Sequence, residues 1–234
     1  MELQRREWKE EDKLEFKRYL ESQGNPNSIP FARKVINTSK PMVGINMPTL
    51  RGIAKEIAKG DFMSFLSLDI HDYYENEIIN CALICKIKDF SILKEYLLNY
   101  AENADSWAEI DAVKVPFGKK NHDDYLAFAK KCSEHSKPFV RRLGVILLFA
   151  CLNGEDFEIV KSIIESLKGD EEYYVNMAVA WLVCEMVIKL PEQTIPLVNR
   201  NFLNEFALRK AISKCSDSFR VSDETVAYLR AVNK

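Results

Sequence analysis

Apolar residues recur at helical spacing along the first third of the chain, with turn residues between the apolar segments. Residues 8–22 carry an amphipathic helical pattern that ends at the Gly24–Asn27 turn. Three further helices are expected to start after Ser28, Asn46 and Asp61. Ser, Asn and Asp side chains accept the first free backbone N–H groups of a helix, so each of these residues is a candidate helix cap.

From about residue 72 the helical pattern becomes repetitive. Helical regions begin in pairs near residues 72 and 89, 106 and 121, 136 and 155, 170 and 191, and 204 and 222. The first members of successive pairs start every thirty-odd residues, which is typical of stacked helical hairpins. Such hairpins bury their apolar faces against their neighbours and build a curved array. We therefore predict an all-α fold, a HEAT-like helical-repeat solenoid with a concave groove. The alternative is a compact irregular helical bundle.

Composition agrees with long helices and short connections, because only 8 Gly and 8 Pro occur among 234 residues. No low-complexity segment or long linker interrupts the chain, so a single domain is expected over residues 1–234. The net charge of −2 differs from the basic balance of most nucleic-acid-binding domains, although a local basic groove is compatible with it.

A cytoplasmic location is expected, because the sequence shows neither a membrane span nor a signal peptide and its cysteines fit reduced thiols. The longest apolar run, residues 143–152, is shorter than the roughly 18 residues of a membrane span. The N-terminus lacks the apolar segment of a signal peptide. The 6 cysteines form no CxxC pair and fall mostly in apolar helical patterns, where reduced thiols act as small apolar side chains.

Metal and phosphate chemistry have little support in the sequence. The 3 histidines have no set of His or Cys partners at ligand spacing. No Gly-rich phosphate loop and no GxSxG nucleophile motif occurs. We therefore expect no metal and no organic cofactor.

The segment Asp105–Asp111, with sequence DSWAEID, holds the first candidate site. Asp111 follows Trp107 by four residues, so both side chains share one face of a helix. Because Ile110 and Ala112 flank Asp111, its carboxylate lies in an apolar context that is unfavourable unless the group is paired or functional. Two interpretations stay open: a functional carboxylate, or an aspartate that pairs with an arginine or caps a turn.

Two later segments carry further candidates. Arg141 and Arg142 open an apolar helix, where they suit a phosphate contact, a pair with Asp111, or a solvated surface. Tyr174 and Trp181 are seven residues apart on one helix face, a spacing that is usual for core aromatics.

Three segments, in chain order, together resemble the AlkD family of DNA alkylation-repair glycosylases: Asp105–Asp111, Phe139–Val145 and Tyr173–Trp181. Weaker likenesses at residues 44–51 and 208–222 extend the resemblance over most of the chain. It implies a HEAT-like solenoid that wraps duplex DNA. It also implies hydrolytic excision of cationic N3- and N7-alkylated purines without flipping of the base into a pocket.

The resemblance also assigns roles to single residues. The catalytic carboxylate falls on Asp111, the phosphate-gripping arginine on Arg142 and a cleft aromatic on Trp181. A second cleft tryptophan is expected at position 108, where this chain has Ala108 directly after Trp107. Tyr174 is expected to line the cleft with them. The residues expected to contact DNA are Arg51, Arg141, Arg142, Arg209 and Lys210.

Three functions remain in competition. The first is a DNA glycosylase, in which the Asp111 carboxylate stabilises positive charge on the deoxyribose and orients water, with no cofactor. The second is a non-catalytic binder of distorted or branched DNA, which Ala108 suggests. The third is a protein-interaction scaffold, which the near-neutral charge suggests. The expected partner is duplex DNA, alkylated or distorted, and the expected state is a monomer without metal or membrane contact.

Overall fold

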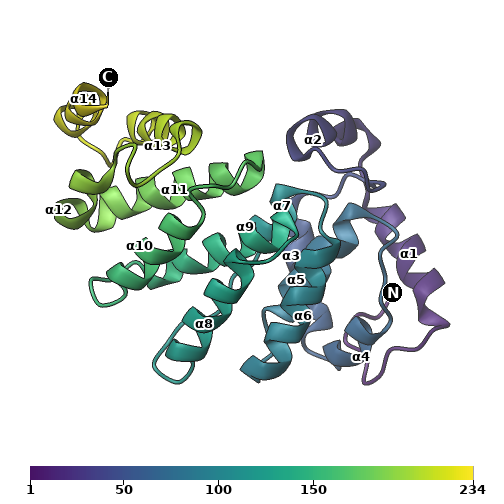
Figure 1. Ribbon diagram of the computed structural model, residues 1–234. Helices are drawn as coiled ribbons and strands as arrows, with labels where there is room; N and C mark the ends of the chain where they lie inside the picture. Colours follow the sequence, from purple (N-terminus) through teal and green to yellow (C-terminus); the bar gives the residue numbers. More distant parts are fainter. Residues whose placement is uncertain (234) are drawn as a thin grey trace. The chain divides into compact units, whose positions relative to one another are not determined.

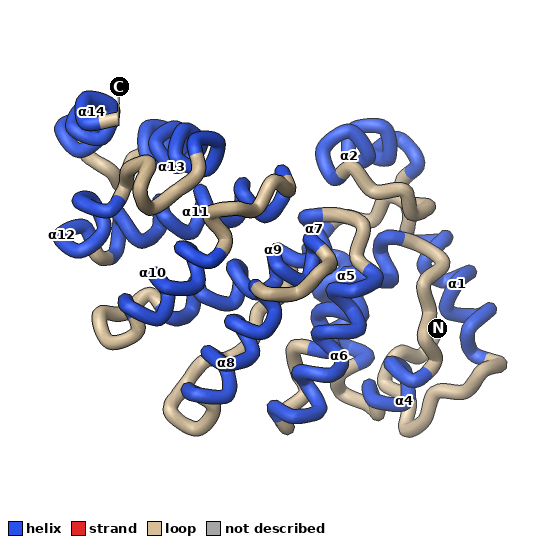
Figure 2. Tube along the Cα trace, in the orientation of Figure 1, coloured by secondary structure: helices blue, strands red, loops and turns tan. Residues whose placement is uncertain are grey.

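The computed structural model describes residues 1–233, which form helices joined by turns and loops and contain no strand (Figures 1 and 2). The predicted all-α class is therefore confirmed. The chain divides into two compact units, Met1–Val115 (unit 1) and Pro116–Lys234 (unit 2). The HEAT-like arrangement and the single domain stay predictions. No helix within residues 1–233 has the length and apolar character needed to cross a membrane.

Unit 1 is organised around its fifth helix. Its helices are α1 (Asp12–Gln23), α2 (Ile29–Ile36), α3 (Met47–Ile57), α4 (Phe62–Ser67), α5 (Tyr74–Ile84), α6 (Phe90–Asn103) and α7 (Trp107–Asp111), with a 3-10 turn at Pro26–Ser28. Helices α3, α4, α6 and α7 all contact α5, which is buried over nearly its whole length. A helix that is covered on all sides must satisfy every polar side chain it carries, and α5 carries Glu75, Asn76, Glu77 and Asn80.

Unit 2 is organised around its longest helix. Its helices are α8 (His122–Ser133), α9 (Pro138–Leu147), α10 (Phe157–Ser166), α11 (Tyr173–Lys189), α12 (Pro191–Thr194), α13 (Glu205–Asp217) and α14 (Asp223–Val232), with 3-10 turns at Leu148–Cys151 and Ile195–Leu197. Helix α11 packs between α9 and α13, and α8 packs on α9. Because α11 is apolar on most of its circumference, it forms the centre of the core of this unit.

Most predicted helix starts are confirmed by their caps. The side chain of Asn46 accepts the Thr49 N–H at 3.0 Å, and Asp61 accepts the N–H groups of Met63 and Ser64. Ser28 precedes α2 as predicted but makes no capping hydrogen bond, and its hydroxyl instead lies 2.8 Å from the Asn25 carbonyl and 2.9 Å from the Gly44 carbonyl.

The predicted pairs after residue 72 are each found, but with two corrections. The region expected at residue 106 contains the five-residue α7, and the region expected at residue 191 contains the four-residue α12 followed by the 3-10 turn Ile195–Leu197. Both are too short for the arm of a regular hairpin. Such short helices gain little from backbone hydrogen bonds alone, so tertiary contacts decide their position.

The close approach of α8 and α9 depends on Gly144. A Cβ atom at Gly144 would lie 2.6 Å from the Ser133 backbone nitrogen and 2.7 Å from the Ala129 carbonyl oxygen, whereas at Gly169 it would meet nothing within 4 Å. We expect Gly144→Ala to lower the free energy of unfolding by about 1–3 kcal/mol through overpacking. Gly169→Ala is the matched control and should change it by less than about 0.5 kcal/mol. Urea unfolding measures both, and equal effects would contradict this account.

Candidate functional site

A pocket of about 620 Å³ lies within unit 1. Its walls come from α2, the loop before α3, the start of α5 and α7. Phe31, Tyr74 and Trp107 supply aromatic surface, and Glu75 and Asp111 supply carboxylates. Among the described residues that line the pocket, none is Lys, Arg or His. A pocket of this composition suits a flat group that carries positive charge and disfavours a phosphate.

The structure brings together three residues of the predicted site in this pocket. Trp107, Ala108 and Asp111 all line it, and all three are half-buried on α7. Trp107 therefore provides an indole beside Asp111 although position 108 is alanine. The indole Nε1 of Trp107 donates to the Val35 carbonyl at 3.3 Å, so it also links α7 to α2.

Glu75 is a second carboxylate of the pocket and is only 1% exposed. It accepts the backbone N–H groups of Val43, Gly44 and Ile45, the shortest at 2.7 Å from Gly44. Gly44 has a φ of +83°, and a Cβ there would lie 2.3 Å from the Asn25 carbonyl oxygen. The loop therefore needs glycine at this position in order to direct three donors at one buried carboxylate.

Helix α7 is fastened by its own N-terminal residues. The Ser106 hydroxyl donates to the Ile36 carbonyl at 2.8 Å and caps α7 by accepting the Ala108 N–H. The Asp105 carboxylate accepts the Thr38 hydroxyl at 2.6 Å and the Ser39 N–H at 2.8 Å. Burial raises the pKa of Asp105, but these hydrogen bonds outweigh burial and lower it overall.

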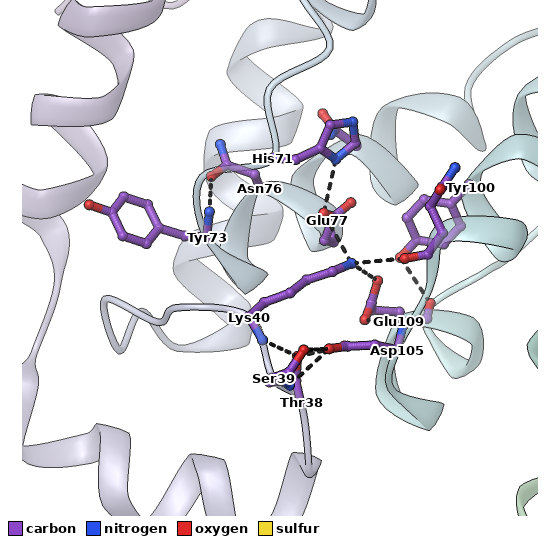
Figure 3. A network of polar contacts seen from close by, with 12 residues as sticks. Thr38, Ser39, Lys40, His71, Tyr73, Asn76, Glu77, Tyr100, Asp105 and Glu109 are labelled. Carbon is purple, nitrogen blue, oxygen red and sulfur yellow. Dashed lines mark hydrogen bonds and ion pairs between the residues drawn. The ribbon is translucent and has the colours of Figure 1, made fainter.

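A buried ion cluster lies next to these contacts (Figure 3). The Lys40 ammonium lies 2.7 Å from a carboxylate oxygen of Glu109 and 3.1 Å from one of Glu77, and both carboxylates are almost fully buried. Burial raises the pKa of Glu109 to about 7, against the opposing effect of Lys40. Burial lowers the pKa of Lys40, but the hydrogen bonds and attraction of Glu109 and Glu77 raise it overall.

His71 adds a second positive group to this cluster. Its Nδ1 lies 2.9 Å from Glu77, and its Nε2 lies 2.8 Å from Asp69. The hydrogen bond to Glu77 is the main reason why the pKa of His71 is raised to about 9, with burial opposing it. Glu77 therefore lies between two cationic partners.

In unit 2, the two predicted arginines have structural partners. Arg142 on α9 is 4% exposed and donates to the Tyr174 carbonyl at the start of α11. Arg141 lies 2.5 Å from the Asp170 carboxylate and donates to the carbonyls of His135 and Ser136. The DNA contacts expected of both arginines stay predictions.

The aromatic and remaining basic candidates of unit 2 lie nearer its surface. Trp181 is 36% exposed and packs on Phe149, with ring centres 4.5 Å apart. Tyr174 is half-buried and stacks on Phe139 at 5.7 Å. On α13, Arg209 is exposed, and the half-buried Lys210 lies over the Phe206 ring at 5.7 Å. Arg51 is exposed on α3 of unit 1.

Several residues of the site were not predicted from the sequence. Glu75 and Glu77 flank Asn76 at the start of an otherwise apolar helix, and this clustering of acids on a buried helix was the available signal. Phe31 belongs to the apolar pattern of the helix after Ser28, which predicts a helix but no site, and Lys40 lies in a loop, where the sequence gives no sign of burial.

Comparison with known proteins supplies the wider context. A family model described as "DNA alkylation repair enzyme" matches residues 16–215. The chain belongs to this family. No curated protein matches the sequence. The pocket and the DSWAEID segment both lie inside the matched region, which also covers most of unit 2.

Membership of the DNA alkylation repair family confirms the predicted link to DNA alkylation repair and to DNA as the partner. The narrower resemblance to AlkD glycosylases stays a prediction. Within residues 1–233, no three His, Cys, Asp or Glu side chains gather in a way that would hold a metal ion.

The raised pKa of His71 predicts a pH-dependent contribution to stability. Protonated His71 stabilises the fold fully below its ordinary pKa of about 6.5, and this contribution is lost as the pH rises through about 9. We expect less than about 1 kcal/mol, because solvent screens the partly exposed side chain. Urea unfolding of wild type and His71→Gln at pH 6 and 9.5 measures it. A stability difference that is equal at both pH values would contradict the prediction.

Proposed function

We propose that this member of the DNA alkylation repair family is a DNA glycosylase that excises cationic N3- and N7-alkylated purines from duplex DNA without flipping the base into a pocket. The observation that carries the proposal is the pocket of unit 1. It combines the carboxylates of Asp111 and Glu75 with aromatic walls, and no Lys, Arg or His occurs among the described residues that line it. Such an environment stabilises positive charge.

The proposed reaction needs only a carboxylate and water. The bond between C1′ of the deoxyribose and the base nitrogen breaks, and its electron pair goes to the base, which leaves as a neutral purine. Positive charge develops on the sugar, where the Asp111 carboxylate stabilises it. Water adds to C1′ and loses a proton to the carboxylate or to solvent, which leaves an abasic site. No cofactor takes part in this scheme.

Other residues are proposed for DNA contact. The exposed face of Trp181 suits a cationic sugar or base, a contact worth roughly 0.5–2 kcal/mol. Trp107, Ala108 and Tyr174 are proposed to line the DNA-facing surface of their own units. Arg142 is proposed as a phosphate contact, which would require it to share its guanidinium with the Tyr174 carbonyl or to release that carbonyl.

The first test is base release from duplex DNA that contains N7-methylguanine, under single-turnover conditions. We expect Asp111→Asn to slow release by about 100-fold or more, because the amide cannot stabilise the developing charge. Glu95→Gln removes an exposed carboxylate on α6 and is the matched control, with release equal to wild type. Undiminished release by Asp111→Asn would refute the assignment. If the wild-type protein binds the duplex but releases no base, the alternative of a non-catalytic DNA-binding protein is favoured.

Substitution of the basic residues should affect either DNA binding or protein stability, depending on whether the side chain is exposed or paired. Arg51→Ala and Arg209→Ala remove exposed charges, so each should weaken DNA binding and reduce the slope of log K against log salt by about 1. Arg141→Ala should chiefly lower the stability of unit 2, because it leaves the buried Asp170 carboxylate without its cationic partner. Binding titrations between about 50 and 200 mM salt, with urea unfolding, separate these effects. Unchanged salt slopes for both exposed arginines would contradict the phosphate contacts.

A further inference from the structure

Helix α7 cannot hold Asp111 in place by itself. It spans five residues, Trp107–Asp111, and isolated helices of that length are unstable in water. Its orientation therefore depends on side-chain contacts. Asp105 and Ser106 fasten its N-terminal end to residues 36–39, and the Trp107 indole bonds to α2. These contacts hold the start of the helix, whereas Asp111 lies at its end.

Glu109 is a polar anchor of α7 two residues before Asp111. Its side chain is fully buried, and Lys40 is its closest cationic partner, at 2.7 Å. The Tyr100 hydroxyl donates to the Glu109 backbone carbonyl at 3.2 Å, and the Asp105 N–H donates to its carboxylate at 3.3 Å. A buried carboxylate is strongly destabilising when its cationic partner is removed, so loss of Lys40 is expected to weaken the hold on α7 at this position.

Lys40 also ties α7 to the central helix of unit 1. Its ammonium group bridges Glu109 on α7 and Glu77 on α5. Glu77 also forms a hydrogen bond with His71 (Figure 3). The negative charge of Glu109 helps to raise the pKa of both Tyr74 on α5 and Tyr100 on α6, after burial as the main cause. One cation in the loop between α2 and α3 therefore fixes two elements that line the pocket.

We propose that Lys40 is a positioning residue for Asp111, which it holds in the pocket by neutralising Glu109. The inference rests on the proposed glycosylase function, but its structural part can be tested separately. It goes beyond the residues that the resemblance assigns, because Lys40 does not line the pocket and acts on Asp111 indirectly, through Glu109.

The test compares Lys40→Met, Lys40→Arg, Lys40→Met/Glu109→Gln and wild type. Lys59→Met is the matched control, because Lys59 forms an exposed pair with Glu56 in the same unit. Base release from N7-methylguanine DNA at saturating protein, the Kd for the same duplex, and hydrogen exchange of residues 105–112 are measured on each protein at pH 6 to 9.

We expect Lys40→Met to slow base release by about 10- to 100-fold with an unchanged Kd, because small displacements of a catalytic group have effects of this size. Its rate relative to wild type should fall further as the pH rises, since Glu109 then ionises without a cationic partner. Hydrogen exchange should accelerate across residues 105–112. Lys40→Arg should retain most of the rate, and Glu109→Gln should restore part of it to Lys40→Met by removing the buried charge.

Three results would overturn the proposal: wild-type release by Lys40→Met, a loss matched by an equal loss of DNA affinity, or no recovery in the double variant. A wild-type protein that releases no base would refute the proposed function instead. Hydrogen exchange then decides the structural part, because unchanged protection of residues 105–112 in Lys40→Met would refute the positioning role and faster exchange would support it.

Discussion

The desolvation of three glutamates constrains the architecture of unit 1. Glu75, Glu77 and Glu109 are each at most 3% exposed, and a buried carboxylate without partners is destabilising by several kcal/mol. Each has its own solution: backbone N–H groups for Glu75, His71 and Lys40 for Glu77, and Lys40 for Glu109. Because all of these donors except His71 come from the loop between α2 and α3, satisfying the carboxylates also positions that loop, α5 and α7 around one pocket.

The two units are stabilised in different ways. In unit 2 the long apolar helix α11 lies between α9 and α13, and its polar contacts, such as Arg142 with the Tyr174 carbonyl, join neighbouring helices. In unit 1 the short helix α7 beside the pocket is held by polar contacts of Asp105 and Ser106 in addition to the buried side chain of Ile110. A polar network fixes the geometry of its side chains more narrowly than apolar packing, but the loss of one member weakens the whole network. The proposed site therefore gains a well-defined orientation of Asp111 and becomes sensitive to substitutions in the network.

The net charge of this protein says little about which of its surfaces would bind DNA. The net charge is −2, yet the family acts on DNA, and exposed arginines such as Arg51 and Arg209 lie on helices of different units. The pocket itself carries carboxylates, and this fits a cationic group better than the phosphate backbone. Local fields depend on which charges are buried and paired, and a sum over the sequence does not contain that information.

The sequence alone determined the all-α class, the positions of most helices and the pairing of Trp107 with Asp111 on one helix face. Local spacing, caps and turn residues decide these features, and they operate within a few residues of one another. The four-residue spacing of Trp107 and Asp111 is one such local relation, and the structure places both in the pocket. Tertiary structure decided the shortness of α7, the partners of Arg141 and Arg142, and the contacts of Lys40 and Glu75. Those depend on contacts such as Lys40 with Glu109, 69 residues apart, and the desolvation that governs them exists only once the chain has packed.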